Sequence, residues 1–166
     1  MNVFLGLGSN ISKRYDNLQL GIKYLNDHPH IWLINKSYIY ESSPMYSLDQ
    51  PNYYNMVIEV ETNLDPLNLL KVVKGIEVKC GRVKNEIKNL PRELDIDILS
   101  IDNLIIESNV LNVPHINISE RLFVLRPWND IAPDFVIPKI DKTVANILKE
   151  NKSDSSLRML LIVDDK

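Results

Sequence analysis

The sequence predicts an α+β fold in which helices pack on a largely antiparallel sheet. Strand-like and helix-like segments follow one another in the order β-α-β-β-α-β-β, and strands that adjoin in sequence favour antiparallel pairing. No repeat or low-complexity linker divides the 166 residues, a length that suits one domain with one sizeable core. We therefore expect residues 1–166 to form a single domain, whose polar tail from about residue 151 is weakly determined.

Apolar patterning defines the first half of the chain. An apolar run that ends at a Gly-Ser-Asn turn signal, followed by two stretches with alternating apolar residues, predicts strands over residues 2–8, 31–40 and 53–62. Leu18, Ile22 and Leu25 share one face at helical spacing, which predicts an amphipathic helix over residues 14–27. A polar loop joins the last two strands over residues 42–52.

The second half begins with a well-marked helix. Asp65 has the position of an N-cap and Pro66 that of the first helical residue, and the helix should end near Cys80-Gly81. A charged loop, a strand, a hairpin partner for that strand across Asp102-Asn103 and a terminal helix should follow over residues 81–92, 93–101, 104–106 and 143–150. Together these elements predict a ferredoxin-like arrangement in α-β-α layers.

Composition excludes several classes of protein. A net charge of −3 and a pI of about 5.6 argue against a general nucleic-acid binder, because a phosphate backbone attracts basic proteins. The apolar runs are too short to span a bilayer, and the N-terminus has no basic segment typical of a signal peptide. Because Cys80 is the single cysteine, no internal disulfide can form, and we expect a cytoplasmic protein.

Two aspartates in the strand predicted over residues 93–101 are candidates for metal binding. Because alternate residues of a strand share a face, Leu94, Ile96 and Ile98 should enter the core while Asp95 and Asp97 face the other way, their Cα atoms about 6.5–7 Å apart. Carboxylates at that distance repel unless a cation lies between them, and oxygen ligands suit Mg²⁺. A solvated strand edge is the alternative interpretation.

Basic residues gather directly before these aspartates: Lys79, Arg82, Lys84, Lys88 and Arg92. Taken alone, the cluster fits either a solvated loop or a clamp for a polyanion such as a triphosphate. Its position beside an acidic pair favours the clamp. His115 fits a structural or a functional role, and Phe123 alone would be assigned to the core.

Several motifs in a fixed order carry a family resemblance: Gly6-Leu7-Gly8-Ser9-Asn10, Tyr40-Glu41-Ser42-Ser43-Pro44, Asp49-Gln50-Pro51, Gly81-Arg82-Val83, residues 91–99, Val113-Pro114-His115, Arg121, Phe123-Val124-Leu125 and Asp130-Ile131-Ala132-Pro133. From residue 3 to about residue 138 the chain resembles the 6-hydroxymethyl-7,8-dihydropterin pyrophosphokinases of folate biosynthesis. It departs from them at Asn89 and Leu90, where an aromatic residue and Gly are usual, and at Lys84 and Lys88, where Arg is frequent.

The resemblance implies an activity and a site. The β,γ-diphosphoryl group of ATP would pass to the pterin's hydroxymethyl group, releasing AMP, with two Mg²⁺ ions on Asp95 and Asp97. Catalytic roles are implied for Arg82, Arg92, Asp95 and Asp97. Contacts to ATP are implied for Arg82, Lys84, Lys88, Arg92, Ile98, His115 and Arg121. Contacts to the pterin are implied for Ser42, Ser43, Met45, Tyr53, Asn55 and Phe123.

Further expectations and two rival functions accompany this assignment. The pterin should stack between Tyr53 and Phe123, and we expect a monomer whose partners are ATP and the pterin, without nucleic acid or membrane. Glu77 would contact the nucleotide or be a solvated helix charge, and Trp128 should belong to the core. One rival is a single-stranded RNA platform of ferredoxin-like type. The other is a metal-dependent nuclease or phosphatase that uses the same carboxylates.

Overall fold

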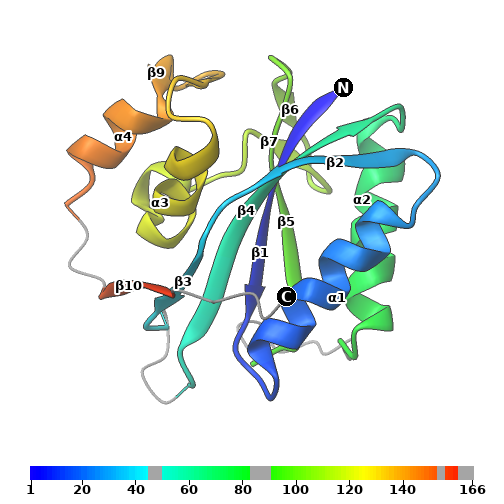
Figure 1. The fold of residues 1–166 in the computed structure, drawn as a ribbon. Helices are drawn as coiled ribbons and strands as arrows, with labels where there is room; N and C mark the ends of the chain where they lie inside the picture. Colours follow the sequence, from blue (N-terminus) through cyan, green and yellow to red (C-terminus); the bar gives the residue numbers. More distant parts are fainter. Residues whose placement is uncertain (45–49, 83–90, 153–155, 161–166) are drawn as a thin grey trace.

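The computed structural model describes residues 1–44, 50–82, 91–152 and 156–160 (Figure 1). Its elements are β1 Asn2–Ser9, α1 Arg14–Asn26, β2 Ile31–Lys36, β3 Ile39–Ser42, β4 Tyr53–Thr62, α2 Pro66–Lys79, β5 Asp95–Ile101, β6 Ile106–Glu107, β7 Asn112–Val113, η1 Ile118–Glu120, α3 Leu122–Ile131, β8 Val136–Ile137, β9 Lys142–Thr143, α4 Val144–Glu150 and β10 Leu157–Leu160. None of the helices in these ranges is long and apolar enough to cross a membrane.

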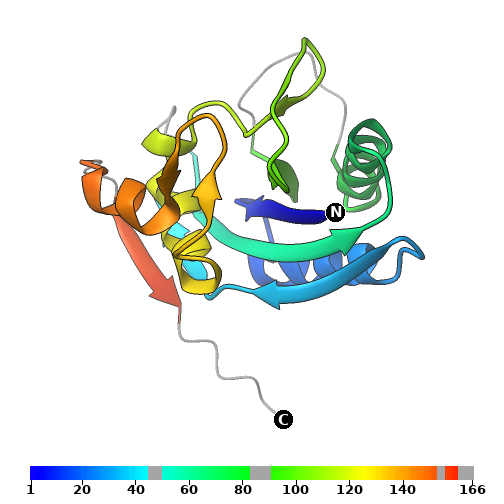
Figure 2. The ribbon, with the colours of Figure 1, turned by 90° about the horizontal axis from the view of Figure 1, so that it is seen from above.

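One antiparallel sheet organises the fold. Its strands lie in the order β10-β3-β4-β1-β5, and β2 also pairs with β4, so β5 and β10 lie at opposite edges (Figure 2). Every pair in the sheet is antiparallel. The predicted α+β, ferredoxin-like architecture is therefore confirmed.

The strand predicted over residues 31–40 divides into β2 and β3 at Ser37. The Ser37 backbone N–H donates to the Val57 carbonyl oxygen at 2.9 Å, and the Ser37 hydroxyl accepts from the Val57 N–H at 2.9 Å. The Ser37 hydroxyl takes the place of a backbone carbonyl as the partner of the Val57 N–H, so the backbone pairing with β4 is interrupted at Ser37. On either side of this break, β2 and β3 both remain paired with β4.

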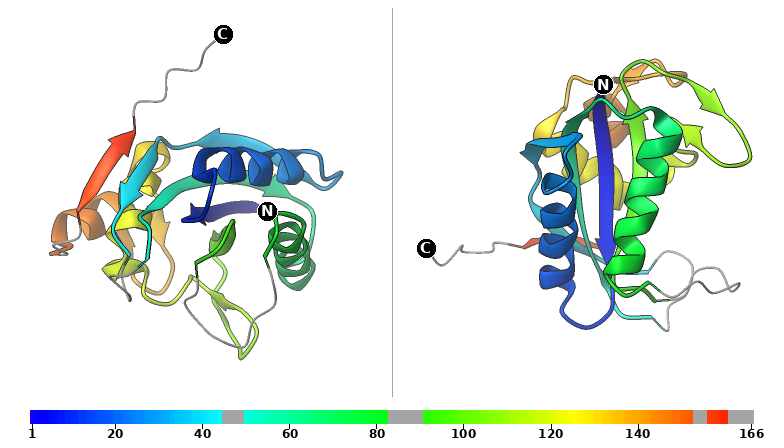
Figure 3. Two further views of the ribbon diagram at one scale, coloured as in Figure 1. Left: turned by 90° about the horizontal axis from the view of Figure 1, so that it is seen from below. Right: turned by 90° about the vertical axis from the view of Figure 1, so that its right-hand side faces the viewer.

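Each face of the sheet has its own apolar core. The first core joins the sheet to α1 and α2, which lie side by side in the right-hand panel of Figure 3, and it contains Leu5, Leu18, Val73 and Ile96 among its buried residues. The second core lies on the opposite face, between the sheet and helices α3 and α4, and contains Phe4, Leu99 and Trp128. The predicted core position of Trp128 is confirmed. The second core covers only part of its face, which leaves room for a cavity.

Helix α2 begins and ends where the sequence predicts. The Asp65 carboxylate accepts the N–H groups of Leu67 and Asn68, which would otherwise lack helical partners, and Pro66 follows at the first helical position. At the other end Gly81 has a φ of +106°, which favours glycine and turns the chain out of the helix. This turn brings Arg82 towards β5.

The predicted hairpin over residues 104–106 is wrong. Strand β6 pairs with β7 and not with β5, because the N–H of Leu104 bonds to the carbonyl oxygen of Ile101 in a tight turn that leads away from the sheet edge. The hydroxyl of Ser108 then accepts two backbone N–H groups and closes the short β6–β7 connection.

Helix α3 and strand β10 are among the elements that the sequence did not predict. Helix α3 contains Pro127, a residue type that usually disrupts a helix interior. The buried side chains of Val124, Leu125 and Trp128 nevertheless anchor the helix on the second core. Strand β10 lies in the tail described above as polar and weakly determined. It adds to the edge at β3, where Arg158 pairs with Glu41 at 2.9 Å.

Candidate active site

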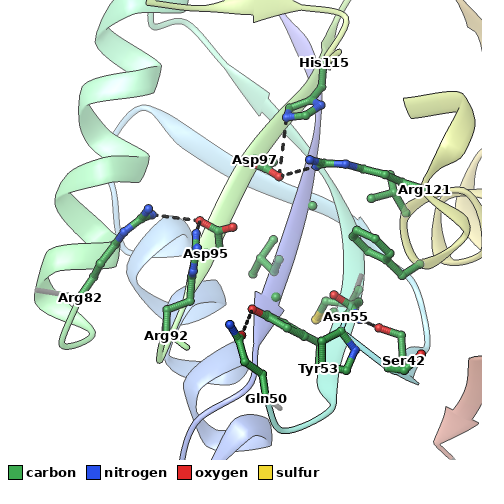
Figure 4. A pocket seen from close by; sticks show the side chains of 18 of the residues that line it. Ser42, Gln50, Tyr53, Asn55, Arg82, Arg92, Asp95, Asp97, His115 and Arg121 are labelled. Atoms are coloured by element: carbon green, nitrogen blue, oxygen red, sulfur yellow. Dashed lines mark hydrogen bonds and ion pairs between the residues drawn. The ribbon is translucent and has the colours of Figure 1, made fainter. Parts of the chain in front are cut away.

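A cavity of about 320 Å³ opens on the second face, beside α3 (Figure 4). Most of the predicted site residues line it: Ser42, Ser43, Tyr53, Asn55, Arg82, Arg92, Asp95, Asp97, His115, Arg121 and Phe123. Ile98 is an exception, because its side chain packs in the first core on the other side of the sheet. Met45, Lys84 and Lys88 lie outside the described residues.

Two glycines of β1 line the base of the cavity and leave it free of side chains. Gly6 and Gly8 lie on β1 directly opposite Asp97 and Asp95 of β5. A Cβ atom at Gly8 would approach the Asn55 Oδ1 to 3.3 Å, closer than such atoms normally come. The missing side chains therefore leave space above β1 between the acidic strand β5 and the Tyr53–Asn55 segment of β4.

The two aspartates project from the same face of β5, as predicted. Leu94, Ile96 and Ile98 point to the first core with exposed fractions of 0%, 0% and 4%. On the cavity side, the Asp95 Oδ1 lies 2.9 Å from Arg82 Nη1 and 3.1 Å from Arg92 Nη1.

Asp97 has a separate pair of basic neighbours (Figure 4). Its Oδ2 lies 3.1 Å from Arg121 Nη1 and 3.8 Å from His115 Nε2. The residues that bring these groups together come from the end of α2, from β5 and from the segment that follows β7. Side chains as far apart in sequence as Arg82 and Arg121 thus converge on one face of a single strand.

Burial and charge act in opposite directions on the ionisable groups. Burial alone would raise the pKa of Asp95, but the nearby Arg92, Lys74 and Arg82 offset this and hold its pKa below the ordinary value. Burial lowers the pKa of His115, and Asp97 only partly offsets that effect. At pH 7 the site therefore contains an ionised Asp95 and a neutral imidazole beside the arginines.

The acidic pair fits a magnesium ion bound together with substrate phosphates. Its ligands are all oxygens, which Mg²⁺ prefers, and Mg²⁺ is commonly held by one or two carboxylates plus phosphate groups. Across the described ranges, no group of three or more His, Cys, Asp or Glu side chains is placed to form a metal cage. The donor set suits an ion that takes its remaining ligands from water and phosphate oxygens.

The opposite wall of the cavity is aromatic and amide-rich. Asn55 is 6% exposed and donates from Nδ2 to the Ser42 Oγ at 2.9 Å, which fixes its amide with Oδ1 above Gly8. Tyr53 donates its hydroxyl to Gln50 Oε1 at 3.3 Å. Phe123, at the start of α3, also lines this side. This wall therefore offers ring faces and an oriented acceptor to a flat polar ligand.

Asn10, at the end of β1, connects the two walls. It is 1% exposed, and its Oδ1 accepts the Arg92 N–H at 2.8 Å. Its Nδ2 donates to Gln50 Oε1 at 3.2 Å, beside Tyr53. The sequence placed Asn10 in a turn and in a family motif but gave it no role in the site, because hydrogen bonds to residues about 40 and 80 positions away leave no local pattern.

Helix α2 supplies two charged residues whose positions the sequence did not predict. Glu77 is 1% exposed, so it is neither a solvated helix charge nor a residue of the cavity lining. Burial raises the pKa of Glu77, and Lys74 opposes this shift. Lys74 itself lines the cavity. The spacing of Glu77 with the buried Val73 and Ile76 was the available signal that it faces inwards.

Comparison with known proteins identifies the family of this chain. A model of the family described as 7,8-dihydro-6-hydroxymethylpterin-pyrophosphokinase (HPPK) matches residues 4–133. The 2-amino-4-hydroxy-6-hydroxymethyldihydropteridine pyrophosphokinase of Pseudomonas aeruginosa is 37% identical over 82% of this chain and 83% of its own length.

Longer relatives contain a segment similar to this chain. The folic acid synthesis protein fol1 of Schizosaccharomyces pombe is 36% identical over 98% of this chain, which spans only 22% of that protein. A crystal structure of Plasmodium falciparum HPPK-DHPS with pteroate has the same fold, with a TM-score of 0.73 at 18% identity over 90% of this chain and 42% of that one. From the family match and these relatives, the chain belongs to the 7,8-dihydro-6-hydroxymethylpterin-pyrophosphokinase family.

Proposed function

We propose that this chain transfers the β,γ-diphosphoryl group of ATP to the hydroxymethyl group of 6-hydroxymethyl-7,8-dihydropterin and releases AMP. The observation that carries the proposal is one cavity with an acidic pair surrounded by arginines on one wall and Tyr53, Asn55 and Phe123 on the other. Membership of the family and the pyrophosphokinase activity named for its Pseudomonas aeruginosa relative support the same reaction.

Arginines dominate the wall that would bind the triphosphate. Arg82, Arg92 and Arg121 each place an Nη1 atom on a carboxylate of β5, and a guanidinium has further N–H donors for phosphate oxygens. His115 lies among them, and Lys84 and Lys88 are proposed as adjuncts from the loop that follows Arg82. Catalysis would then consist of holding the reacting groups in line and stabilising charge.

Asp95 and Asp97 would hold two Mg²⁺ ions. When bound, Mg²⁺ would neutralise charge on the phosphates and lower the pKa of the attacking hydroxyl. The arginines pair with both carboxylates on the cavity face of β5. The pKa of Asp95 is lowered, so this carboxylate is ionised at neutral pH. Ile98 would contribute through its backbone, because its side chain lies in the core.

The aromatic wall would bind and orient the pterin. Tyr53 and Phe123 would stack on its faces, each ring contributing about 0.5–1.5 kcal/mol beyond area burial. The amide of Asn55, held by Ser42, directs Oδ1 into the cavity as an acceptor for N–H groups of the pterin edge. Ser43 and Met45 are proposed as further contacts from the preceding loop.

A direct assay tests the reaction. The protein is mixed with ATP, Mg²⁺ and the pterin alcohol, and AMP is measured by chromatography together with the diphosphorylated pterin. We expect equal amounts of both products, and none when the pterin is omitted. Release of phosphate from ATP without the pterin would instead support the phosphatase. Binding of single-stranded RNA in a filter assay would support the RNA platform.

A further inference from the structure

The outer edge of β5 is completed by side chains instead of a strand. Ile96 lies between Asp95 and Asp97, and its N–H and C=O groups point away from β1. The N–H donates to Glu77 Oε1 at 2.8 Å, and the carbonyl oxygen accepts from Lys74 Nζ at 3.1 Å. Two residues of α2 therefore hold the peptide groups that separate the two aspartates.

The same carboxylate holds an arginine of the site. Glu77 Oε2 pairs with Arg82 Nη1, and that nitrogen also lies 2.9 Å from Asp95 Oδ1. Lys74 Nζ lies 2.7 Å from Glu77 Oε1. Charges consequently alternate through Lys74, Glu77, Arg82, Asp95 and Arg92.

Burial makes this arrangement informative. A carboxylate taken out of water costs free energy unless several donors compensate it, and an apolar side chain often stabilises such a position as well or better. Glu77 is 1% exposed and accepts from Lys74, Arg82 and the Ile96 N–H. What the carboxylate adds over an apolar residue is a fixed geometry for Arg82 and for the backbone of β5.

We propose that Glu77, supported by Lys74, is a positioning residue for diphosphoryl transfer: it fixes Arg82 beside Asp95 and sets the spacing of Asp95 and Asp97. The inference rests on the proposed function. Glu77 acts through these groups and does not touch substrate, since it is buried and, among the described residues, it does not line the cavity.

The substitution Glu77→Gln tests the proposal with little change of shape. The amide oxygen can still accept the Ile96 N–H, but the charge that holds Arg82 and Lys74 is lost. We expect kcat to fall about tenfold or more, as for partners that orient ligands at metal sites, while KM for the pterin changes less than about twofold. Lys74→Gln should show the same pattern with a smaller fall. Glu61→Gln and Lys71→Gln, at exposed positions, are matched controls that should behave as wild type.

A double-mutant cycle separates positioning from a general loss of stability. In an Arg82→Ala background, Glu77→Gln should lose most of its effect on kcat, because the residue it positions is gone. Full additivity of the two substitutions would overturn the proposal. A lower thermal midpoint with an unchanged kcat per folded molecule would overturn it as well.

Failure of the proposed function is recognised separately, because the wild-type protein would then form no AMP with the pterin. In that case, calorimetry with Mg²⁺ and a non-hydrolysable ATP analogue takes the place of kcat. Glu77→Gln should weaken binding about tenfold relative to wild type and to Glu61→Gln. Equal affinities of the three proteins would show that Glu77 does not position the acidic pair.

Discussion

The two faces of β5 differ in what their residues do, although they alternate along one strand. Towards α1 and α2, Ile96 and Ile98 are buried in an apolar core. Towards the cavity, Asp95 and Asp97 are surrounded by basic side chains. The contrast teaches that stability and activity can be separated between neighbouring residues, because consecutive side chains of a strand enter different environments.

The largest effect is expected on the cavity face. Asp97→Ala should reduce kcat about a thousandfold, because the substitution removes a proposed ligand of the Mg²⁺ ions. The thermal midpoint should change by no more than about 2 °C, since Asp97 is partly exposed and contributes little to a core. Kinetics and thermal unfolding check both statements, with the exposed Asp134→Ala as control. Near-normal turnover of Asp97→Ala in Mg²⁺ would refute the metal assignment.

The neighbouring residue should give the opposite result. Ile96→Ala removes a fully buried side chain from the first core and should lower the free energy of unfolding by about 2–5 kcal/mol. The backbone of Ile96 keeps its bonds to α2, so kcat of the folded protein should stay within about threefold of wild type. Denaturant unfolding and saturation kinetics provide the two numbers. A large loss of kcat without loss of stability would contradict the division between the faces.

Phe123 packs against the second core and also lines the cavity, so its substitution tests whether one residue serves stability or ligand binding. Phe123→Ala should weaken pterin binding about tenfold, because a stacking surface is lost, while ATP binding changes little. Calorimetry with each ligand decides this. Equal losses for both ligands would show that Phe123 serves the core and that its removal damages the whole site.

The smallest effects concern two helical glycines on the first face. A Cβ atom at Gly21 of α1 would lie 2.7 Å from the buried Leu94 Cδ2, so Gly21→Ala should destabilise the protein by about 1–2 kcal/mol despite a better helix propensity. At Gly75 of α2 a Cβ atom meets nothing within 4 Å, and Gly75→Ala should stabilise it by about 0.4–1 kcal/mol. If both substitutions raised the free energy of unfolding, the Leu94 side chain would be able to shift away from a Cβ atom at position 21 at little cost.

Local signals predicted much of the fold. The Asp65-Pro66 start of α2, the apolar stripe of α1 and the alternation of β4 and β5 specify elements by neighbours in sequence, and the structure contains them. The break of the predicted strand at Ser37, helix α3 and strand β10 were not predicted, because contacts with residues distant in sequence determine them. The Ser37 hydroxyl accepts a hydrogen bond from the Val57 N–H, and burial of Trp128 anchors α3. Strand β10 pairs with a strand more than 100 residues away in sequence.

The site shows the same limit. Alternation along one strand predicted the common face of Asp95 and Asp97, and the resemblance to a family named the arginines that surround them. The roles of Asn10, Lys74 and Glu77 depend on hydrogen bonds to backbone groups of other segments, which no spacing in the sequence reveals. The proposed roles of Lys84 and Lys88, which lie outside the described residues, remain predictions.

The edges of the sheet also constrain how this fold can be enlarged. At one edge, β10 joins β3 without contributing a residue to the cavity lining. At the other edge, Glu77 and Lys74 occupy the backbone groups of Ile96 that an added strand would need. A strand inserted there, from a longer chain or from another copy, would have to displace α2 from the acidic pair. Additions to the sheet are therefore compatible with an intact site at the β10 edge and incompatible with it at the β5 edge.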